Sequence, residues 1–391
     1  MRSRLLPLAL AASLVAASAL TVAQQTNPDG SLKPSSPVTR LFTQDPYTEY
    51  EILAPGSEAF RIKYIPETTE VGAKEIENAT RAGSKGEDIQ VYDPRTGNPV
   101  EFTYKNEPNP EVYAIRAKLP FPVPAGGIGR VLIYKTYKDA RTYMMNGEDL
   151  VWVRSLSGYR LGVVLPKGYA FISSNVAAQL STTASGQLKL AFANPSGQAN
   201  PVTIHARKTT AAFTAQPYVD MFFDDVKTLY DLGDPSAGSV AIEQTYSDYR
   251  KGARARLDAL TYLPLNGLKV VDLDTAKPLP TVAEGTFTFA ALEVPIVNDR
   301  QSAHLRVTGT LAGAASGYRL ENGELVFDRP LHGLRNTVVL PAGWEVAGVS
   351  QSATIGTQRT AAGARTFVAL INLNAENQYR VQIRALKSGT P

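Results

Sequence analysis

The feature that most constrains this chain of 391 residues is an internal repeat with a period of about 175–180 residues. The clearest block, GYRLGVVLPKGY at residues 158–169, corresponds to GLRNTVVLPAGW at residues 333–344. Two copies of one sequence pattern predict two copies of one structural unit. Further blocks recur in the same order, pairing residues 50–62 with 230–242, 89–100 with 268–279, 146–156 with 322–331, and 201–208 with 380–387.

The repeat sets the expected domain organisation. Because 43% of the residues are hydrophobic, each copy has enough apolar side chains to bury its own core without disulfides. The expected segments are a signal peptide at residues 1–23, a flexible polar linker at 24–39, repeat 1 at 40–210, a join at 211–232 and repeat 2 at 233–391.

Short alternating segments indicate which unit is repeated. VYAIRAK at residues 112–118 and HLRVTGT at 304–310 alternate apolar and polar side chains, a pattern typical of half-buried strands. Asn146-Gly147 and Asn322-Gly323, each flanked by strand-like sequence, predict a type I′ hairpin in both copies. The chain is therefore expected to be all-β, with two tandem antiparallel β-sandwich domains, Ig-like or jelly-roll-like, that arose by internal duplication.

One stretch departs from the strand pattern. Apolar side chains recur four residues apart between residues 215 and 232, which predicts a short amphipathic helix at the join. In one interpretation the helix packs between the two sandwiches. In the other it exposes a partner-docking patch of three apolar side chains, Met221, Phe222 and Phe223.

The first residues predict export. Two arginines, Arg2 and Arg4, precede an uncharged apolar run that ends in small residues, the order typical of a secretory signal. The alternative is an uncleaved N-terminal anchor, which would be the chain's only membrane contact. A periplasmic, outer-surface or extracellular location is expected. Residues 24–39 are polar and rich in proline and serine, as a solvated linker would be.

The charge balance argues against a nucleic-acid partner. The chain has 40 Lys and Arg against 36 Asp and Glu, and loss of Arg2 and Arg4 with the signal would leave it almost neutral. Nucleic-acid binding needs basic residues gathered on one surface, so the sequence pI of about 9.0 does not by itself indicate it.

Residues that commonly carry catalysis are scarce. The absence of cysteine excludes thiol nucleophiles, disulfides and iron–sulfur clusters, and three histidines leave little material for a metal site. The sequence contains no Gly-x-Ser-x-Gly elbow, no His-Glu-x-x-His and no phosphate-binding loop. It therefore predicts no catalytic residue, metal site or cofactor.

Positions shared by the two copies are most simply explained by folding. Asp93 and Asp272, each followed three residues later by threonine, predict turns closed by side-chain-to-backbone hydrogen bonds. Arginines kept in both copies are expected to be structural, and they form the pairs Arg154 with Arg329 and Arg160 with Arg335.

Positions that differ between the copies are the better place to look for function. Repeat 1 has YKTYKDARTYMM at residues 134–145, where repeat 2 has the neutral TGTLAGAASGY at 308–318. Exposed tyrosines beside lysines can stack on sugar rings or hold an anionic polymer. The alternative is an edge strand whose lysines prevent aggregation. The candidate ligand-binding residues are Tyr134, Lys135, Tyr137, Lys138, Arg141 and Tyr143.

These observations favour a non-enzymatic binding or scaffold protein of the bacterial envelope, whose partner is an envelope protein or a polysaccharide. One alternative is a secreted carbohydrate-active hydrolase, which would need two carboxylates roughly 5–10 Å apart in an aromatic-lined cleft. Another is a surface structural protein that self-associates through its sheet edges.

Overall fold

A computed structural model describes residues 47–80, 83–107, 111–156, 160–193, 200–214, 226–257, 265–360, 363–372 and 379–389. The expected signal peptide and linker lie outside these residues. Residues 38–391 form one compact unit. The described residues form strands joined by turns and two short 3-10 segments, η1 (Pro235–Ala237) and η3 (Gly313–Ser316), without an α-helix, which confirms the all-β prediction.

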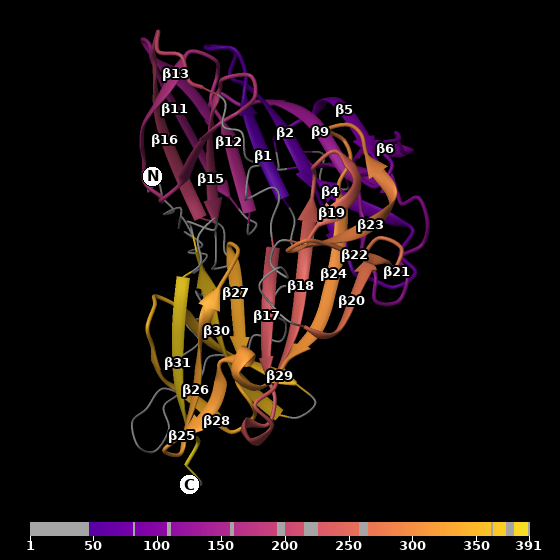
Figure 1. The fold of residues 1–391 in the computed structure, drawn as a ribbon. Coiled ribbons are helices and arrows are strands. Elements are labelled where there is room, and N and C mark those ends of the chain that lie inside the picture. The colour runs from indigo at the N-terminus through magenta and orange to yellow at the C-terminus, as the bar shows by residue number, and fades with distance from the viewer. Residues whose placement is uncertain are drawn as a thin grey trace, which may run out of the picture. The chain divides into compact units, whose positions relative to one another are not determined.

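Repeat 1 is built on a long seven-stranded sheet with a smaller sheet packed at each end (Figure 1). Its strand order is β14 (Gln179–Thr182), β15 (Leu188–Ala193), β12 (Arg160–Val164), β1 (Tyr47–Ile52), β2 (Ala59–Ile65), β9 (Leu132–Lys138) and β5 (Glu87–Tyr92). One smaller sheet is β10 (Tyr143–Asn146), β11 (Asp149–Leu156), β16 (Asn200–Lys208) and β13 (Tyr169–Ser174). The other is β4 (Glu75–Ala79), β7 (Tyr113–Lys118) and β6 (Phe102–Asn106), and a short ribbon joins β3 (Glu67–Thr68) to β8 (Gly129–Arg130).

Repeat 2 has the same arrangement with one more strand in its long sheet. The order there is β21 (Lys277–Leu279), β20 (Asn266–Asp272), β24 (Ala303–Leu311), β18 (Val240–Asp248), β17 (Val226–Leu232), β27 (Arg335–Val339), β30 (Gly363–Ile371) and β29 (Thr354–Thr360). Its smaller sheets are β25 (Tyr318–Glu321), β26 (Glu324–Leu331), β31 (Tyr379–Lys387) and β28 (Trp344–Val349), and β19 (Gly252–Arg256), β23 (Phe287–Ile296) and β22 (Thr281–Glu284).

Each long sheet contains one parallel pair in an otherwise antiparallel ladder. Strand β1 runs parallel to β12 in repeat 1, and β17 runs parallel to β27 in repeat 2. The first strand of each repeat thus lies beside the strand of the VVLP block, the most similar segment of the two copies. This shared pairing lets residues of the two repeats be compared position by position.

Each repeat holds two hydrophobic cores where the sequence predicts one sandwich. In repeat 1 the larger core contains Trp152 and Phe60, and a second core around Ile115 lies under the three-stranded sheet. In repeat 2 the corresponding cores contain Phe327 and Val307. The long sheet therefore serves two sandwiches at once, because its inward side chains are covered by a different small sheet at each end.

The helix predicted at the join is wrong for its described part. Residues Val226–Leu232, placed in the join by the sequence, form strand β17 inside the long sheet of repeat 2, and their side chains alternate between the two faces of the sheet. Apolar residues four apart share one face of a strand as well as one face of a helix, since four is a multiple of the strand period of two. Met221, Phe222 and Phe223 lie outside the described residues.

Candidate ligand site at the junction of the repeats

A buried arginine joins the two repeats. The Arg130 guanidinium on β8 binds both carboxylate oxygens of Asp274, with Nε–Oδ1 and Nη2–Oδ2 distances of 2.6 and 2.7 Å. It also donates to the Oγ and the carbonyl oxygen of Ser302, at 2.6 and 2.7 Å. Burial raises the pKa of the Asp274 carboxyl, and the Arg130 guanidinium opposes that shift. Two buried charges that satisfy one another fix the junction in one geometry.

Corresponding turns of the two repeats meet at this junction. The Asp93 carboxylate accepts the backbone N–H of Arg95 at 2.9 Å. The Asp272 carboxylate accepts the backbone N–H groups of Asp274 and Thr275 at 2.8 and 3.2 Å. The predicted side-chain-to-backbone turns are therefore confirmed in both copies, and each turn presents its backbone to the other repeat.

The backbone contacts between these turns are reciprocal. The N–H of Ile128 in repeat 1 donates to the carbonyl oxygen of Leu273 at 2.8 Å. The N–H of Ser302 in repeat 2 donates to the carbonyl oxygen of Pro94 at 2.7 Å. Pro94 and Leu273 each follow the turn aspartate directly, so the two hydrogen bonds relate equivalent positions. The junction thus resembles the self-complementary interface of a two-fold dimer, within one chain.

An aromatic cluster lies beside the charged part of the junction. Ile65, Tyr92 and Leu132 of repeat 1 are buried, and Tyr249 of repeat 2 packs against them. The Arg300 guanidinium lies over the Tyr92 ring, 4.3 Å from its centroid. Apolar packing and a cation–π contact therefore reinforce the buried ion pair.

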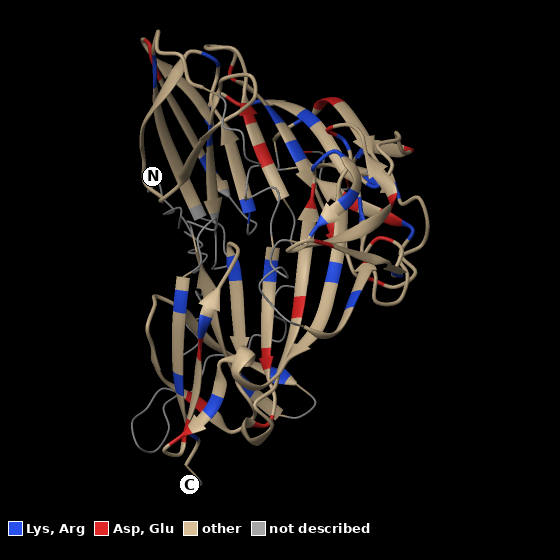
Figure 2. Ribbon diagram, in the orientation of Figure 1, with Lys and Arg blue, Asp and Glu red and all other residues tan. Residues whose placement is uncertain are grey.

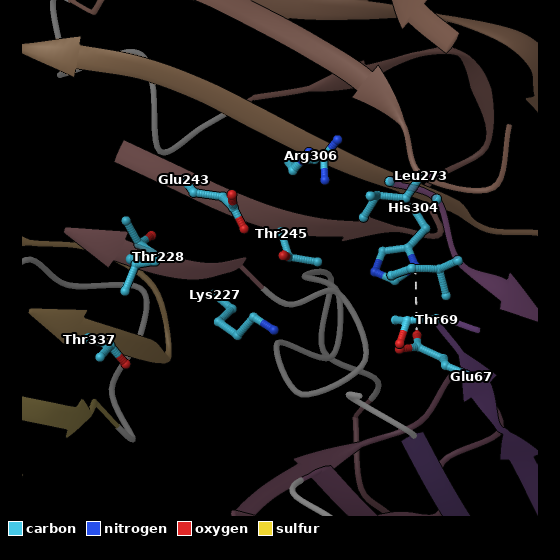
Figure 3. A pocket seen from close by; sticks show the side chains of 14 residues that line it. Glu67, Thr69, Lys227, Thr228, Glu243, Thr245, Leu273, His304, Arg306 and Thr337 are labelled. Carbon is cyan, nitrogen blue, oxygen red and sulfur yellow. Dashed lines mark ion pairs between the residues drawn. The ribbon is translucent and has the colours of Figure 1, made fainter. Parts of the chain in front are cut away.

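A cavity of about 270 Å³ opens at the same junction (Figure 3). Repeat 1 supplies a wall from β3 and the turn before β8, and repeat 2 supplies strands β17, β18, β24 and β27. The polar side chains of its wall are Glu67, Thr69, Lys227, Thr228, Glu243, Thr245, His304, Arg306 and Thr337.

Three charged residues of the cavity, Lys227, Glu243 and Arg306, lie on one sheet face of repeat 2. Lys227 pairs with Thr245 across β17 and β18, and Thr245 pairs with Arg306 across β18 and β24. Glu243 lies two residues before Thr245 and therefore on the same face. Figure 3 shows the Lys227, Thr245 and Glu243 side chains extending from neighbouring strands toward the same space. Cation, hydroxyl and carboxylate groups thus converge from a rigid support.

A histidine–carboxylate pair connects the two walls, because His304 lies on β24, on the same face as Arg306, whereas Glu67 lies on β3 of repeat 1. His304 Nδ1 lies 3.6 Å from Glu67 Oε1, and the two side chains are only 2% and 5% exposed. The turn of repeat 1 that contains Gly127 approaches the backbone of repeat 2 closely, and only glycine permits this approach. A Cβ on Gly127 would lie 2.9 Å from the carbonyl oxygen of Leu273, which is too short for any side chain. The two repeats therefore approach closely enough to line the cavity together.

The chemistry of this wall suits recognition of a small polar molecule. Lys227 and Arg306 supply cationic donors, while Glu243 and the threonine hydroxyls supply acceptors. The described residues of the wall include no Phe, Tyr or Trp. Among the described residues, no three His, Asp or Glu side chains lie together as metal ligands would.

Three of the six candidate ligand-binding residues of repeat 1 are buried. Lys135 and Tyr137 are 5% and 3% exposed, and the Lys135 ammonium donates to Asn78 Oδ1 at 2.5 Å. Tyr143 is 1% exposed and donates its hydroxyl to the carbonyl oxygen of Ala54 at 3.2 Å. These side chains belong to the interior because strand β9 turns Lys135 and Tyr137 toward the cores.

The other three candidate residues lie in two different places, one at the junction and two on the exposed surface. Tyr134 lies in the junction cluster, where burial raises the pKa of its hydroxyl to about 12. Lys138 and Arg141 are exposed, and Arg141 donates to Asp139 Oδ1 at 3.2 Å. The structure therefore does not bring the six residues together on one surface.

Sequence reasoning missed the cavity residues, because they come from segments far apart in the chain. The sequence signal that could have pointed to these residues is a difference in side-chain type between the two copies at corresponding sheet positions. Lys227 and Tyr47 both pair with an arginine of the VVLP strand, Arg335 or Arg160, and so occupy equivalent positions. A cation in repeat 2 replaces an aromatic side chain in repeat 1 at this point.

Within the described part of the chain, no helix has the length and hydropathy needed to span a membrane. No known family of proteins matches the sequence, and no curated protein matches it.

The solved structures that are weakly similar to the chain include two of different description. One, from Parabacteroides distasonis ATCC 8503, is described as a "putative protease"; it is 9% identical, with 88% of this chain and 99% of that chain covered and a TM-score of 0.23. The other is a tetra-tandem repeat from the extending region of a large adhesion protein; it is 10% identical, with 89% and 100% covered and a TM-score of 0.10. Likenesses at these scores assign this chain neither to a family nor to an activity.

Proposed function

We propose that the protein is an exported, non-enzymatic binding protein of the bacterial envelope, and that the junction cavity is its ligand site. The observation that carries this proposal is the convergence of Lys227, Arg306 and Glu243 on a cavity lined by both repeats. The wall is preformed, because the buried Arg130–Asp274 pair holds the repeats together beside it. A preformed site binds without the loss of conformational entropy that ordering a loop requires.

The cavity volume and wall chemistry define the ligand class. A volume of about 270 Å³ lies just below the usual range for drug-sized ligands, so the ligand is about as large as a monosaccharide. The two cations favour an anionic group, and Glu243 with the threonines favours hydroxyls. An acidic sugar such as a hexuronate has both features.

Titration of D-glucuronate against D-glucose tests the proposal, because the two sugars differ only in the carboxylate. Isothermal titration calorimetry of the purified protein should detect D-glucuronate and show weaker or no binding of D-glucose. Lys227→Met and Arg306→Met should each weaken binding roughly tenfold, as expected for loss of a charge-assisted hydrogen bond. The exposed control Lys138→Met should bind normally.

Release of nitrophenol from a glucuronide distinguishes catalysis from binding. After long incubation with 4-nitrophenyl β-D-glucuronide, a binding protein releases no nitrophenol. Steady release that Glu67→Gln or Glu243→Gln abolishes would contradict the proposal and favour the hydrolase. Equal binding of glucose and glucuronate, or no effect of either cavity variant, would also count against it.

A further inference from the structure

A second cavity, of about 530 Å³, lies at one end of the larger sandwich of repeat 1. Four segments of repeat 1 line this end cavity: the turn between β1 and β2, the hairpin between β10 and β11, the turn before β13, and the end of β16. It shares no lining residue with the junction cavity. Its side chains include Pro55, Met145, Glu148, Lys167, Tyr169 and Lys208.

Tyr169 is a buried tyrosine whose hydroxyl has no partner in the protein. The side chain is only 4% exposed, and its ring packs in the larger core of repeat 1. None of the described residues forms a hydrogen bond with its hydroxyl. The hydroxyl of a buried tyrosine normally finds a hydrogen-bond partner. This hydroxyl is therefore available to a ligand in the end cavity that Tyr169 lines.

A neighbouring tyrosine shows how the protein satisfies a phenol at this place. The Tyr143 hydroxyl donates to the carbonyl oxygen of Ala54 at 3.2 Å, directly before the cavity residue Pro55. Burial and the nearby Tyr169 phenol raise the pKa of Tyr143 to about 12. The two phenols thus lie close together beside the cavity, and only that of Tyr143 is satisfied by the backbone.

The lining of the end cavity has one cation more than it has carboxylates. Lys208 binds Glu148 at 3.2 Å, so these two charges compensate one another. Lys167 is exposed, and none of the described residues forms an ion pair or hydrogen bond with it. The described residues of the lining include no other charged side chain. One ammonium group is therefore left for a ligand of opposite charge.

Carboxylates beside the end cavity are placed away from Lys167. Asp149, which follows the hairpin, binds Arg207 through both oxygens at 2.6 and 2.9 Å. Glu58, in the β1–β2 turn, accepts the backbone N–H of Asp139 at its carbonyl oxygen and is not part of the lining. The positive charge of Lys167 is therefore not neutralised by its surroundings.

Repeat 2 keeps the framework of this end but neither of the two groups. Trp344 occupies the position of Tyr169, since each pairs with the lysine that ends the neighbouring strand. Ala342 stands in the place of Lys167 within the VVLP block. The fold therefore requires neither a phenol nor an ammonium group at this end of the sandwich.

We propose that the end cavity is a second ligand site, which binds a small organic monocarboxylate with an apolar body, such as a medium-chain fatty acid. Its volume lies within the range of about 300–1,000 Å³ that is usual for small-molecule sites. The one uncompensated ammonium group favours a single negative charge, and the Tyr169 hydroxyl supplies a second donor to the same carboxylate. Pro55 and Met145 offer apolar surface to the rest of the ligand.

Other ligand classes match these groups less well. A phosphate dianion would leave one negative charge without a partner, and a sugar acid such as D-glucuronate has no apolar body. A polyanion needs basic residues gathered on one surface, whereas Figure 2 shows Lys and Arg interspersed with Asp and Glu on the described strands. The surplus charge at the end cavity is local and single, as a monocarboxylate requires.

Calorimetric titration of sodium octanoate against 1-octanol tests the proposal, because the two molecules have similar apolar chains and differ in the carboxylate. Octanoate should bind at one site per chain. The alcohol, and acetate, which lacks the chain, should each bind at least about tenfold more weakly. Lys167→Met should weaken octanoate binding about tenfold by loss of a charge-assisted hydrogen bond, and Tyr169→Phe about threefold by loss of a neutral one.

Matched controls separate this site from other lysines and from the junction cavity. Lys138→Met removes another exposed lysine of repeat 1, and Lys387→Met removes the counterpart of Lys208 in repeat 2, so neither should change octanoate binding. Lys227→Met should leave octanoate binding intact, and Lys167→Met should leave D-glucuronate binding intact. Failure of the junction proposal and failure of this one are therefore distinguishable. Because Lys167 is exposed, its variant remains informative even if Tyr169→Phe alters folding.

Absence of octanoate binding would overturn the proposal. Equal affinity for octanoate and 1-octanol, or unchanged octanoate affinity in Lys167→Met, would also overturn it. Tighter binding of inorganic phosphate than of octanoate, lost in Lys167→Met, would assign the end cavity to an inorganic anion instead.

Discussion

The two repeats use one strand order to make sheet faces of opposite character at the junction. In repeat 1, Tyr47 pairs with Ile65, and Ile65 is buried with Leu132 in the aromatic cluster. In repeat 2 the equivalent pair is Lys227 with Thr245, which lines the cavity. The same framework is closed by apolar packing in one copy and left open and polar in the other.

A second cluster closes repeat 1 further along the same face. Lys189 donates to the Tyr47 hydroxyl at 2.6 Å and also binds Glu49. This cluster covers Gly162, where a Cβ would lie 2.9 Å from both Lys189 and Tyr47. The equivalent residue in repeat 2 is Thr337, a residue of the cavity wall. The two repeats therefore share the strand pairings of the sheet, but the side chains on the junction face differ: those of repeat 1 pack against one another, and those of repeat 2 line the cavity.

Removal of the junction arginine should have the largest effect. Arg130→Ala leaves the Asp274 carboxylate buried without its partner, so the free energy of unfolding should fall by about 3–5 kcal/mol. Urea unfolding followed by circular dichroism measures this loss. The control Arg116→Ala, in an exposed ion pair of repeat 1, should change stability very little. Equal effects of the two variants would mean that the junction does not stabilise the chain.

Truncation of one leucine in each copy should test whether the two cores are equivalent. Leu165 and Leu340 occupy corresponding positions and are both 0% exposed. Each change to alanine should lower the free energy of unfolding by about 2–5 kcal/mol, because each leaves a cavity in a packed core. Pro341→Ala should be mild. A loss well below this range for Leu340→Ala alone would place that residue outside the core of repeat 2.

Lys135 should give repeat 1 a pH dependence that repeat 2 lacks, because Gly309 occupies the equivalent place opposite Ile242. Burial lowers the pKa of Lys135 to about 8, from 10.5. Between about pH 8 and pH 10.5, Lys135 is protonated in the unfolded chain but neutral in the folded chain. The free energy of unfolding therefore rises with pH in this range. The rise should be about 3 kcal/mol and absent in Lys135→Met.

Urea unfolding of the wild type and of Lys135→Met below pH 8 and near pH 10.5 measures this difference. The tyrosines titrate equally in both proteins and cancel in the comparison. The exposed control Lys138→Met should follow the wild type. A constant difference between wild type and Lys135→Met at both pH values would show that Lys135 stays charged in the folded protein.

Conversion of one cavity position to its repeat 1 equivalent should have the smallest effect on stability. Thr245→Ile copies Ile65 and places an extra apolar group in the wall, so the free energy of unfolding should change by less than about 1.5 kcal/mol. Binding of D-glucuronate should nevertheless be lost, since the wall becomes apolar where the ligand lies. Wild-type affinity in this variant would show that Thr245 does not line the site.

Local features of the fold were predictable from sequence, and distant contacts were not. Alternation predicted the strands, and the Asp93 and Asp272 turns followed from residues two or three positions apart. The Arg130–Asp274 pair joins residues 144 positions apart, and no local pattern encodes it. The second core of each repeat was missed for the same reason, because it depends on which strands cover each end of the long sheet. The prediction of a ligand-binding surface at residues 134–145 was wrong for Lys135, Tyr137 and Tyr143, which are buried. The tyrosine and lysine content of this segment does not reveal which face of a strand is buried.

Calorimetric titration of D-glucuronate into the wild type and four variants tests the central contrast between the repeats most directly. D-glucuronate should bind at one site per chain, roughly tenfold more weakly in Lys227→Met and in Arg306→Met, and with unchanged affinity in Lys138→Met and Phe102→Ala. Affinity that is unchanged in both cavity variants, or binding that disappears when the repeat 1 residues are changed, would contradict the assignment of the ligand site to the open face of repeat 2.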